Sequence, residues 1–206
     1  MSGLFITFEG IDGVGKSTQA DLLQKFIEDA GREVVRTLEP GGTELGVEIR
    51  HLLLHRKGEV APRAEALLYA ADRSHHVATK INPALAAGKV VISDRYLDSS
   101  VAYQGAGREL SVTEIRDLSL WAVGGLLPKL TVLLDLDAEA ARARRDTTGT
   151  EPDRLEREKT TFFEAVRACY LELAAAEPER FLVVDAALSP NEIQAVIRER
   201  VEGLIR

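Results

Sequence analysis

The sequence contains very few residues that cross-link a chain or carry it into a membrane. A single cysteine among 206 residues excludes an internal disulfide framework and a metal site built from several cysteines, and it is what a reducing compartment permits. No run of 18 or more apolar residues occurs, so no membrane-spanning helix is predicted. The N-terminus lacks the basic start and the cleavage site of a signal peptide. We therefore expect a cytoplasmic protein with no membrane partner.

An excess of basic residues is also missing. The 26 Lys and Arg residues are outnumbered by 33 Asp and Glu residues, which gives a formal net charge of −7. Proteins that coat nucleic acids usually carry a basic excess on one face, so we expect no nucleic-acid partner. The remaining composition, with 45% hydrophobic and 29% charged residues, is typical of one ordinary globular domain.

Short apolar runs alternate with longer segments whose apolar residues recur at helical spacing, which is typical of βαβ units around a parallel sheet. Strands are predicted over residues 4–8, 33–38, 89–93, 130–136 and 180–184. Helices are predicted over residues 16–30, 43–56, 62–86, 111–126, 138–145 and 155–176, with a last helix from Pro190. The sequence thus predicts a three-layer α/β fold, a five-stranded parallel sheet surrounded by helices, in one domain over residues 1–206.

Residues 10–17, Gly-Ile-Asp-Gly-Val-Gly-Lys-Ser, match the phosphate-loop pattern G-x-x-x-x-G-K-[ST] without a mismatch. Successive backbone N–H groups of such a loop form a concave phosphate site, and its glycines allow the required backbone angles. Lys16 brings positive charge to the β- and γ-phosphates, the Ser17 hydroxyl can bind Mg²⁺, and the next helix points its positive end at the phosphates. We predict that the chain binds a nucleoside triphosphate. The residues assigned to it are Gly10, Ile11, Asp12, Gly13, Val14, Gly15, Lys16, Ser17 and Thr18.

Three classes of phosphate-loop protein compete. A GTPase needs Asn-Lys-x-Asp after a strand, which the sequence lacks, and outside the phosphate loop its Asp-x-x-Gly occurs only in the turn-rich stretch 146–149. Motor ATPases usually end a buried strand in paired carboxylates, whereas residues 90–93 run into Asp94 and Arg95. An acid followed by an arginine suits transfer between two anions, because the carboxylate organises Mg²⁺ and the guanidinium bridges two phosphates. This pattern favours a small-molecule kinase with Ser17 and Asp94 at the metal, although a structural ion pair is the alternative for Arg95.

Four blocks of residues, in this order, are similar to those of bacterial-type thymidylate kinases, which belong to the P-loop nucleoside monophosphate kinases. They are FEGIDGVGKSTQ at 8–19, EPGGT at 39–43, YAADR at 69–73, and DRY with SSVAYQG at 94–96 and 99–105. The resemblance covers nearly the whole chain. It implies phosphorylation of dTMP to dTDP with ATP and Mg²⁺, a step in dTTP synthesis, by a homodimer.

The resemblance also implies roles for individual residues. Asp12 is implied to face the deoxyribose and the reacting phosphates, and Arg95 to hold the acceptor phosphate. Tyr69 is implied to stack on thymine and Arg73 to bond the base edge, although their positions alone favour a core tyrosine and a surface ion pair. Tyr103, packed under the sugar C2′, would disfavour a ribose hydroxyl. The residues assigned to the acceptor are Asp12, Pro40, Tyr69, Arg73, Arg95, Ser99, Ser100, Tyr103 and Gln104.

One feature departs from the family pattern, and a second leaves the choice of the catalytic lid arginine undecided. The second block commonly begins with arginine, but Leu38 stands there. Arg36 lies two residues earlier on the same side of the strand and is a candidate substitute. We expect residues 142–155 to form a short mobile lid. The resemblance implies that a lid arginine acts on the transition state, and Arg144 and Arg145 are assigned to catalysis with Lys16, Asp12 and Arg95. A solvated helix face is the alternative for this arginine cluster.

Two other kinds of function stay open. A different nucleotide or deoxynucleoside kinase would share this chemistry and differ in its acceptor. A nucleotide-dependent switch or ATP-binding regulatory subunit would need no second nucleotide site. Elsewhere, Cys169 is predicted to be a buried thiol, Trp121 a core or subunit-contact residue, and His51 with His55 too few ligands for a metal.

Overall fold

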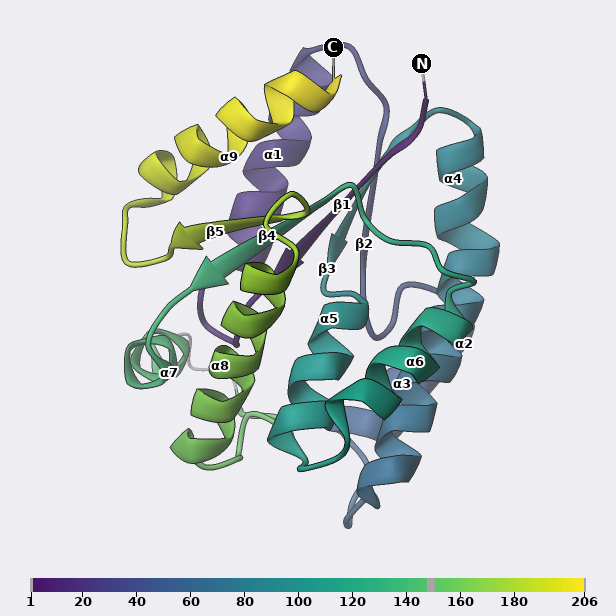
Figure 1. Ribbon diagram of the computed structural model, residues 1–206, viewed down its shortest axis with the longest axis vertical. Helices are drawn as coiled ribbons and strands as arrows, with labels where there is room; N and C mark the ends of the chain where they lie inside the picture. Colours follow the sequence, from purple (N-terminus) through teal and green to yellow (C-terminus); the bar gives the residue numbers. More distant parts are fainter. Residues whose placement is uncertain (1, 148–150, 206) are drawn as a thin grey trace.

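A five-stranded sheet runs through the centre of the protein, seen in a computed structural model that describes residues 2–147 and 151–205 (Figure 1). Its strands are β1 (Leu4–Glu9), β2 (Val34–Leu38), β3 (Val90–Asp94), β4 (Leu130–Asp135) and β5 (Phe181–Asp185). They are parallel to their neighbours in the order β2-β3-β1-β4-β5. Each predicted strand agrees with the observed one to within one residue at either end, so the predicted α/β fold is confirmed.

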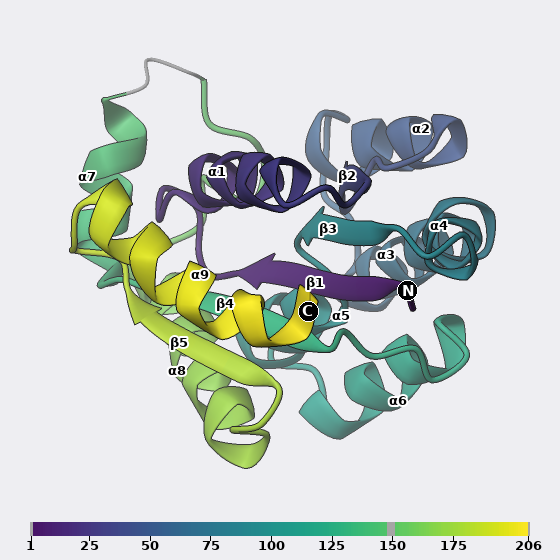
Figure 2. The same ribbon diagram turned by 90° about the horizontal axis from the view of Figure 1, so that it is seen from above.

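Helices cover both faces of this sheet. The helix α1 lies on one side of the strands and α6 and α8 on the other (Figure 2), while α9 packs along α1. The helices are α1 (Lys16–Asp29), α2 (Glu44–Leu54), α3 (Pro62–His76), α4 (Asn82–Ala86), α5 (Leu97–Ser100), α6 (Val112–Ala122), α7 (Ala138–Asp146), α8 (Thr160–Ala176) and α9 (Pro190–Ile205). Within residues 2–147 and 151–205, no helix has the length and apolar character needed to cross a membrane.

The central strands are buried on both faces. Successive side chains of a strand point to opposite faces, so Phe5 and Val91 join a cluster with Ile81 from the helical layer that includes α4. Ile6 belongs to the larger cluster, which contains Leu23 of α1. This arrangement explains why β1 and β3 read as nearly continuous apolar runs.

Helical structure departs from the prediction in several places. The predicted helix 111–126 ends at Ala122, and the predicted helix 62–86 contains a π-helical stretch at Val77–Ile81. Residues 97–107 are helical, with a π-helical part at Val101–Gly107, although none of the helices predicted above includes this segment. This segment contains serines and glycines of low helix propensity, and burial against α6 and α8 stabilises it instead. The predicted start of α8 at residue 155 is wrong, because the Asp153 carboxylate accepts hydrogen bonds from the N–H groups of Leu155 and Glu156 and caps a turn.

The functional segments meet at one edge of the sheet. In the register of the strands, Phe8 pairs with Asp94 and Leu38 also pairs with Asp94. The chain therefore leaves β1, β2 and β3 at the same level. Open α/β sheets bind ligands in the crevice at the carboxyl ends of their strands, and the loops that begin at residues 10, 39 and 95 all start there.

Candidate active site

The loop between β1 and α1 wraps around the amino group of Lys16. Lys16 Nζ donates hydrogen bonds to the carbonyl oxygens of Gly10 at 3.1 Å and Ile11 at 3.0 Å. Gly13 and Gly15 have φ angles of 91° and 95°, which lie in the left-handed region that favours glycine. The predicted strand, loop and helix are confirmed. The loop amides and the N-terminus of α1 thus form an anion-binding site.

The side chains of Ser17 and Asp94 meet beside this loop. Ser17 Oγ, at the start of α1, donates a hydrogen bond of 2.9 Å to Asp94 Oδ2, at the end of β3. Mg²⁺ takes oxygen ligands and usually binds to one or two protein groups together with substrate phosphates and water. The hydroxyl and the carboxylate fit that donor set.

Arg95 is the centre of the polar network next to the loop. Its φ is 71°, an unusual value for a residue with a side chain. Arg95 Nη2 donates to Asp12 Oδ1 at 2.6 Å and to the Tyr103 hydroxyl at 3.0 Å, while Nη1 donates to Ser99 Oγ at 3.1 Å and to the Tyr170 hydroxyl at 3.3 Å. Burial opposes ionisation of Asp12, but the positive charges of Arg95 and a nearby lysine lower its pKa well below the usual range. The site therefore holds a fixed ion pair.

A buried carboxylate, that of Glu9, holds several groups of this network in place through hydrogen bonds. Glu9, at the end of β1, accepts hydrogen bonds from the Tyr96 backbone N–H at 2.8 Å, Ser99 Oγ at 2.6 Å and the Tyr170 hydroxyl at 2.8 Å. Burial, together with the nearby Asp98 carboxylate, raises the pKa of Glu9 to about 7. Glu9 thus anchors the backbone and side chains on either side of Arg95.

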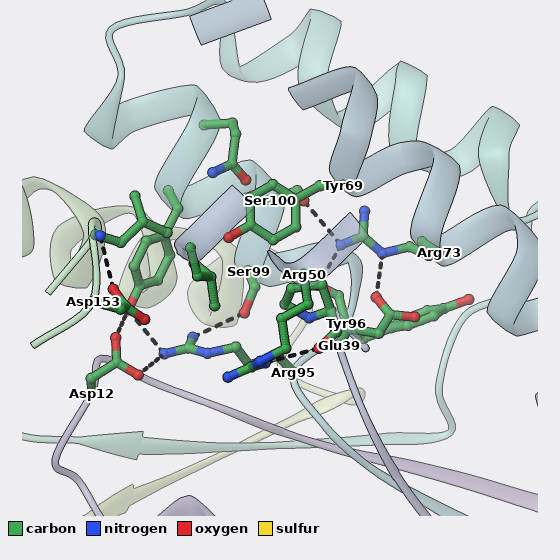
Figure 3. Close-up of a pocket in the computed structure, with 15 residues that line it drawn as sticks. Asp12, Glu39, Arg50, Tyr69, Arg73, Arg95, Tyr96, Ser99, Ser100 and Asp153 are labelled. Atoms are coloured by element: carbon green, nitrogen blue, oxygen red, sulfur yellow. Dashed lines mark hydrogen bonds and ion pairs between the residues drawn. The ribbon is translucent and has the colours of Figure 1, made fainter. Parts of the chain in front are cut away.

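One pocket contains every residue that was assigned to the acceptor (Figure 3). Its predicted lining residues are Asp12, Pro40, Tyr69, Arg73, Arg95, Ser99, Ser100, Tyr103 and Gln104. Glu39, Arg50, Leu54, Tyr96, Asp153 and Leu155 complete the wall. We call this cavity the acceptor pocket. Its residues come from segments that are far apart in the sequence, and the fold brings them together.

Arg73 lies deep in the acceptor pocket and is almost fully buried. Its Nε donates to Glu39 Oε2 at 2.7 Å and its Nη2 to Ser100 Oγ at 2.9 Å (Figure 3). The alternative of a surface ion pair is wrong. Within residues 2–147 and 151–205, Arg73 Nη1 is buried without a hydrogen-bond partner, so the guanidinium group keeps one unsatisfied donor.

A second pocket, the phosphate cleft, adjoins the acceptor pocket. It is lined by the phosphate loop, by Asp94 and by Leu38, and shares Asp12, Glu39, Arg50 and Arg95 with the acceptor pocket. A group bound in one pocket would therefore be next to a group bound in the other.

The position of Leu38 bears on the missing family arginine. Leu38 lines the phosphate cleft, but Arg36 lines neither pocket and instead contacts Asp21 at 3.3 Å. The candidate substitution by Arg36 is not supported. Arg50 of α2 lines both pockets, and its Nη1 donates to the Pro40 carbonyl at 2.8 Å. Arg50 thus adds a cation to the wall of the cleft, to which Leu38 adds none.

The two arginines assigned to the lid both line the phosphate cleft. Arg144 Nη1 donates to the Ala186 carbonyl at 2.7 Å, and Arg145 is largely buried. Arg142 is 62% exposed. Arg154 points elsewhere, toward the Leu53 carbonyl at 2.8 Å. Residues 148–150 of the expected lid lie outside the described residues.

Comparison with known proteins decides the family. The family model described as thymidylate kinase matches residues 8–197. Thymidylate kinases of Clavibacter michiganensis and Leifsonia xyli are 66% and 64% identical over 100% and 98% of this chain, and over 97% and 96% of their own. The chain belongs to the thymidylate kinase family. It is a nucleoside monophosphate kinase, and hence a phosphotransferase. The crystal structure of thymidylate kinase from Ehrlichia chaffeensis matches it with a TM-score of 0.80 and 30% identity, covering 98% of this chain and 99% of that one.

Sequence reasoning missed three residues of this thymidylate kinase site. Arg50 was read as part of a helix, and only its place on the same side of α2 as Leu54, another pocket residue, hinted at a role. Glu9 lies within the first family block, but the resemblance implies no role for it. Tyr170 belongs to an apolar pattern at helical spacing, which predicts a core residue. Nothing in that pattern indicates that its hydroxyl contacts Arg95.

Proposed function

We propose that the protein transfers the γ-phosphoryl group of ATP to dTMP, giving ADP and dTDP, with Mg²⁺ bound to the nucleotide. The observation that carries this proposal is the shared wall of two pockets. A phosphate-loop cleft and a pocket for a second ligand meet at Asp12, Arg50 and Arg95. A nucleotide-dependent switch needs only the first of these, so the second pocket favours a kinase.

On the donor side, the backbone N–H groups of the loop bind the β-phosphate and Lys16 neutralises the β- and γ-phosphates. Lys16 Nζ is now bonded to carbonyl groups of its own loop and lies 3.7 Å from Asp12 Oδ1, so it is held where phosphates would lie. Ser17 and Asp94 would hold the Mg²⁺, which supplies positive charge to the phosphate oxygens. The hydrogen bond of 2.9 Å between them supports this assignment, because it shows that the two oxygens can lie close to one ion.

On the acceptor side, Arg95 binds the phosphate of dTMP. Its guanidinium group is fixed by Asp12 and the Tyr103 hydroxyl, and lies 4.9 Å above the Tyr103 ring. A preorganised cation reduces the entropy cost of bringing two anions together. Arg50, which lines the same two pockets as Arg95, neutralises the same phosphate.

The base occupies the inner end of the acceptor pocket. Tyr69 stacks on thymine, the unpartnered Nη1 of Arg73 donates to a base carbonyl, and Gln104 contacts the same edge. Tyr103 supports the sugar, since its ring is held by Phe162 at a centroid distance of 5.9 Å. This fixed ring disfavours a ribose hydroxyl at C2′.

Arg144 and Arg145 neutralise the transferring group when residues 142–155 close over the cleft. Closure excludes water, and exclusion matters because an open site would hydrolyse ATP. Both arginines already line the phosphate cleft, which supports this role.

A homodimer in the cytoplasm completes the proposal. Trp121 of α6 is 81% exposed and Leu67 of α3 is 58% exposed. Both line one hollow with Ala71 and Leu118. Exposed apolar patches of this kind mark association sites, and a second copy of the chain is the proposed occupant. The buried reduced thiol of Cys169 suits the reducing cytoplasm.

An ADP-release assay with ATP, Mg²⁺ and each nucleoside monophosphate in turn tests the proposal. We expect strong stimulation by dTMP, weaker stimulation by dUMP and none by AMP, CMP or GMP. Stimulation by a different monophosphate would keep the kinase chemistry and refute the base assignment. ATP binding without stimulation by any monophosphate would refute the kinase.

A further inference from the structure

The amide of Gln104 is held in one orientation by a carboxylate behind the acceptor pocket. Gln104 is buried, and its Nε2 donates a hydrogen bond of 2.9 Å to Glu65 Oε1 in α3. Because the nitrogen is used in this way, the oxygen is the atom left for a ligand. Within residues 2–147 and 151–205, no hydrogen-bond donor to Gln104 Oε1 is found.

Two arginines hold the Glu65 carboxylate in place. Arg108 donates to both of its oxygens, at 3.2 and 3.4 Å, and Arg154 Nη2 donates to Oε2. The Glu65 side chain is fully buried. A buried carboxylate between two guanidinium groups offers acceptors alone, so Gln104 can present only its nitrogen to Glu65. A side-chain amide that faced water would have no such constraint.

The pocket wall therefore contains an acceptor, Gln104 Oε1, together with the guanidinium group of Arg73, which lines the same pocket. Arg73 can only donate, and its Nη1 has no partner in the described part of the chain. An imide edge, in which a ring N–H lies next to a carbonyl, is complementary to this pair. The corresponding edge of cytosine is reversed, because it carries an amine donor beside a ring nitrogen that accepts.

We propose that Glu65 is a positioning residue that sets the base preference of the acceptor pocket by fixing the Gln104 amide with its oxygen toward the ligand. This inference rests on the proposed function, since it concerns the base of the same acceptor. Glu65 does not line the pocket. Glu65 acts through Gln104. It selects a pyrimidine with an imide edge, such as thymine, over one with an amidine edge, such as cytosine.

The substitution Glu65→Gln tests this role because it changes one acceptor oxygen into a donor. Arg154 and Arg108 Nη2 both donate to Oε2, so the oxygen of the substituted side chain stays at that position. The new NH₂ group then takes the place of Oε1, beside Gln104 and Arg108 Nε. The Gln104 amide then rotates, and its nitrogen faces the ligand. The Gln104 nitrogen would then face the ring N–H of the base, and a buried donor without an acceptor costs its full desolvation free energy. We therefore expect the preference for an imide base over an amidine base to fall by about tenfold or more.

The measurement compares dTMP with 5-methyl-dCMP, which differs only at the edge that Gln104 reads. For Glu65→Gln we expect the ratio of kcat/KM values for dTMP over 5-methyl-dCMP to fall about tenfold or more, mainly through KM. Binding of the two nucleotides by calorimetry should give the same change in the ratio of Kd values. Glu158→Gln is the matched control, because it removes the other carboxylate partner of Arg108, at 2.5 Å, and leaves Gln104 untouched. It should leave both ratios unchanged.

A merely structural role for Glu65 would lower activity toward both nucleotides equally, and that result would overturn the proposal. So would an effect of Glu65→Gln on the ratio that persists in a Gln104→Ala background. If Glu65→Gln does not fold, Glu65→Asp keeps the charge beside the arginines but withdraws it from Gln104, and the same fall in the ratio is expected. If the unchanged protein fails to phosphorylate dTMP, the proposed function fails, while the calorimetric ratio still decides the role of Glu65.

Discussion

The pKa of Glu9 predicts an unusual dependence of stability on pH. Its carboxyl group has no exposed surface, and burial with the nearby Asp98 charge raises its pKa from 4.5 to about 7. Between these values the folded protein holds a proton that the unfolded chain has released. Stability from this group is therefore present at pH 4.5 and below, and is lost as pH rises to about 7. Each pKa unit corresponds to about 1.4 kcal/mol, so the total loss is about 3 kcal/mol.

The substitution Glu9→Gln isolates this effect. Glutamine does not titrate, and its amide resembles the protonated acid in shape and hydrogen bonding. We expect the two proteins to have similar free energies of unfolding at pH 5. By pH 8 the variant should be more stable than the unchanged protein by up to about 3 kcal/mol. The shifted pKa values of Asp12 and Asp72 are present in both proteins and cancel in the difference.

Urea unfolding followed by far-UV circular dichroism at pH 5, 6, 7 and 8 measures the difference. Glu33→Gln is the control, because Glu33 is exposed and a hydrogen bond from Lys89 lowers its pKa, so its contribution changes below pH 5. The reasoning is refuted if the Glu9→Gln difference is flat across this range. It is also refuted if the unchanged protein gains stability over the variant as pH rises, since that would mean that the three donors around Glu9 favour its charged form.

Three further predictions concern separate parts of the molecule. Arg95→Ala should lower kcat by about a thousandfold or more while ATP binding persists, and undiminished turnover would remove Arg95 from the mechanism. Gly42→Ala should destabilise the fold by about 1–3 kcal/mol, because a Cβ there would lie 2.5 Å from His76 Nε2. Gly203→Ala in α9, where no atom lies within 4 Å of the added carbon, should not destabilise it, and thermal unfolding distinguishes the two. Trp121→Asp should convert the proposed homodimer to a monomer in sedimentation velocity, and a dimer that persists in the variant would place the interface elsewhere.

The elements of the fold follow from local patterns, whereas the segment that reads the acceptor does not. Strand β1 and helix α1 carry strong apolar periodicity and a loop with its own motif, so their positions follow from the sequence. Residues 97–107 have poor helix propensity, and their helix depends on contacts with α6 and α8 that only the tertiary structure supplies. The order of the strands likewise depends on crossovers that periodicity does not reveal.

The acceptor residues could be assigned from the sequence only through a family resemblance. Position alone made Arg73 a surface ion pair, because a sequence does not show that Glu39, 34 residues away, lies beside it in the interior. Arg36 is the converse case, a residue that was expected near the site but does not line it. Strand alternation placed it on the same side as Leu38, but its long side chain turns toward Asp21. The role of Arg50 depends on how α2 packs, which spacing within α2 cannot reveal.

The single tryptophan of the chain lies on the surface, with Trp121 81% exposed. Most globular domains bury such a residue, and its emission then shifts when the core opens. Here the indole already contacts water in the folded protomer, so its emission should change little on unfolding. In the proposed homodimer, with Trp121 at the contact, the emission should instead lie at shorter wavelength than in the separate protomer. The intrinsic fluorescence would then report association, so a dilution series tests the proposed homodimer without a label.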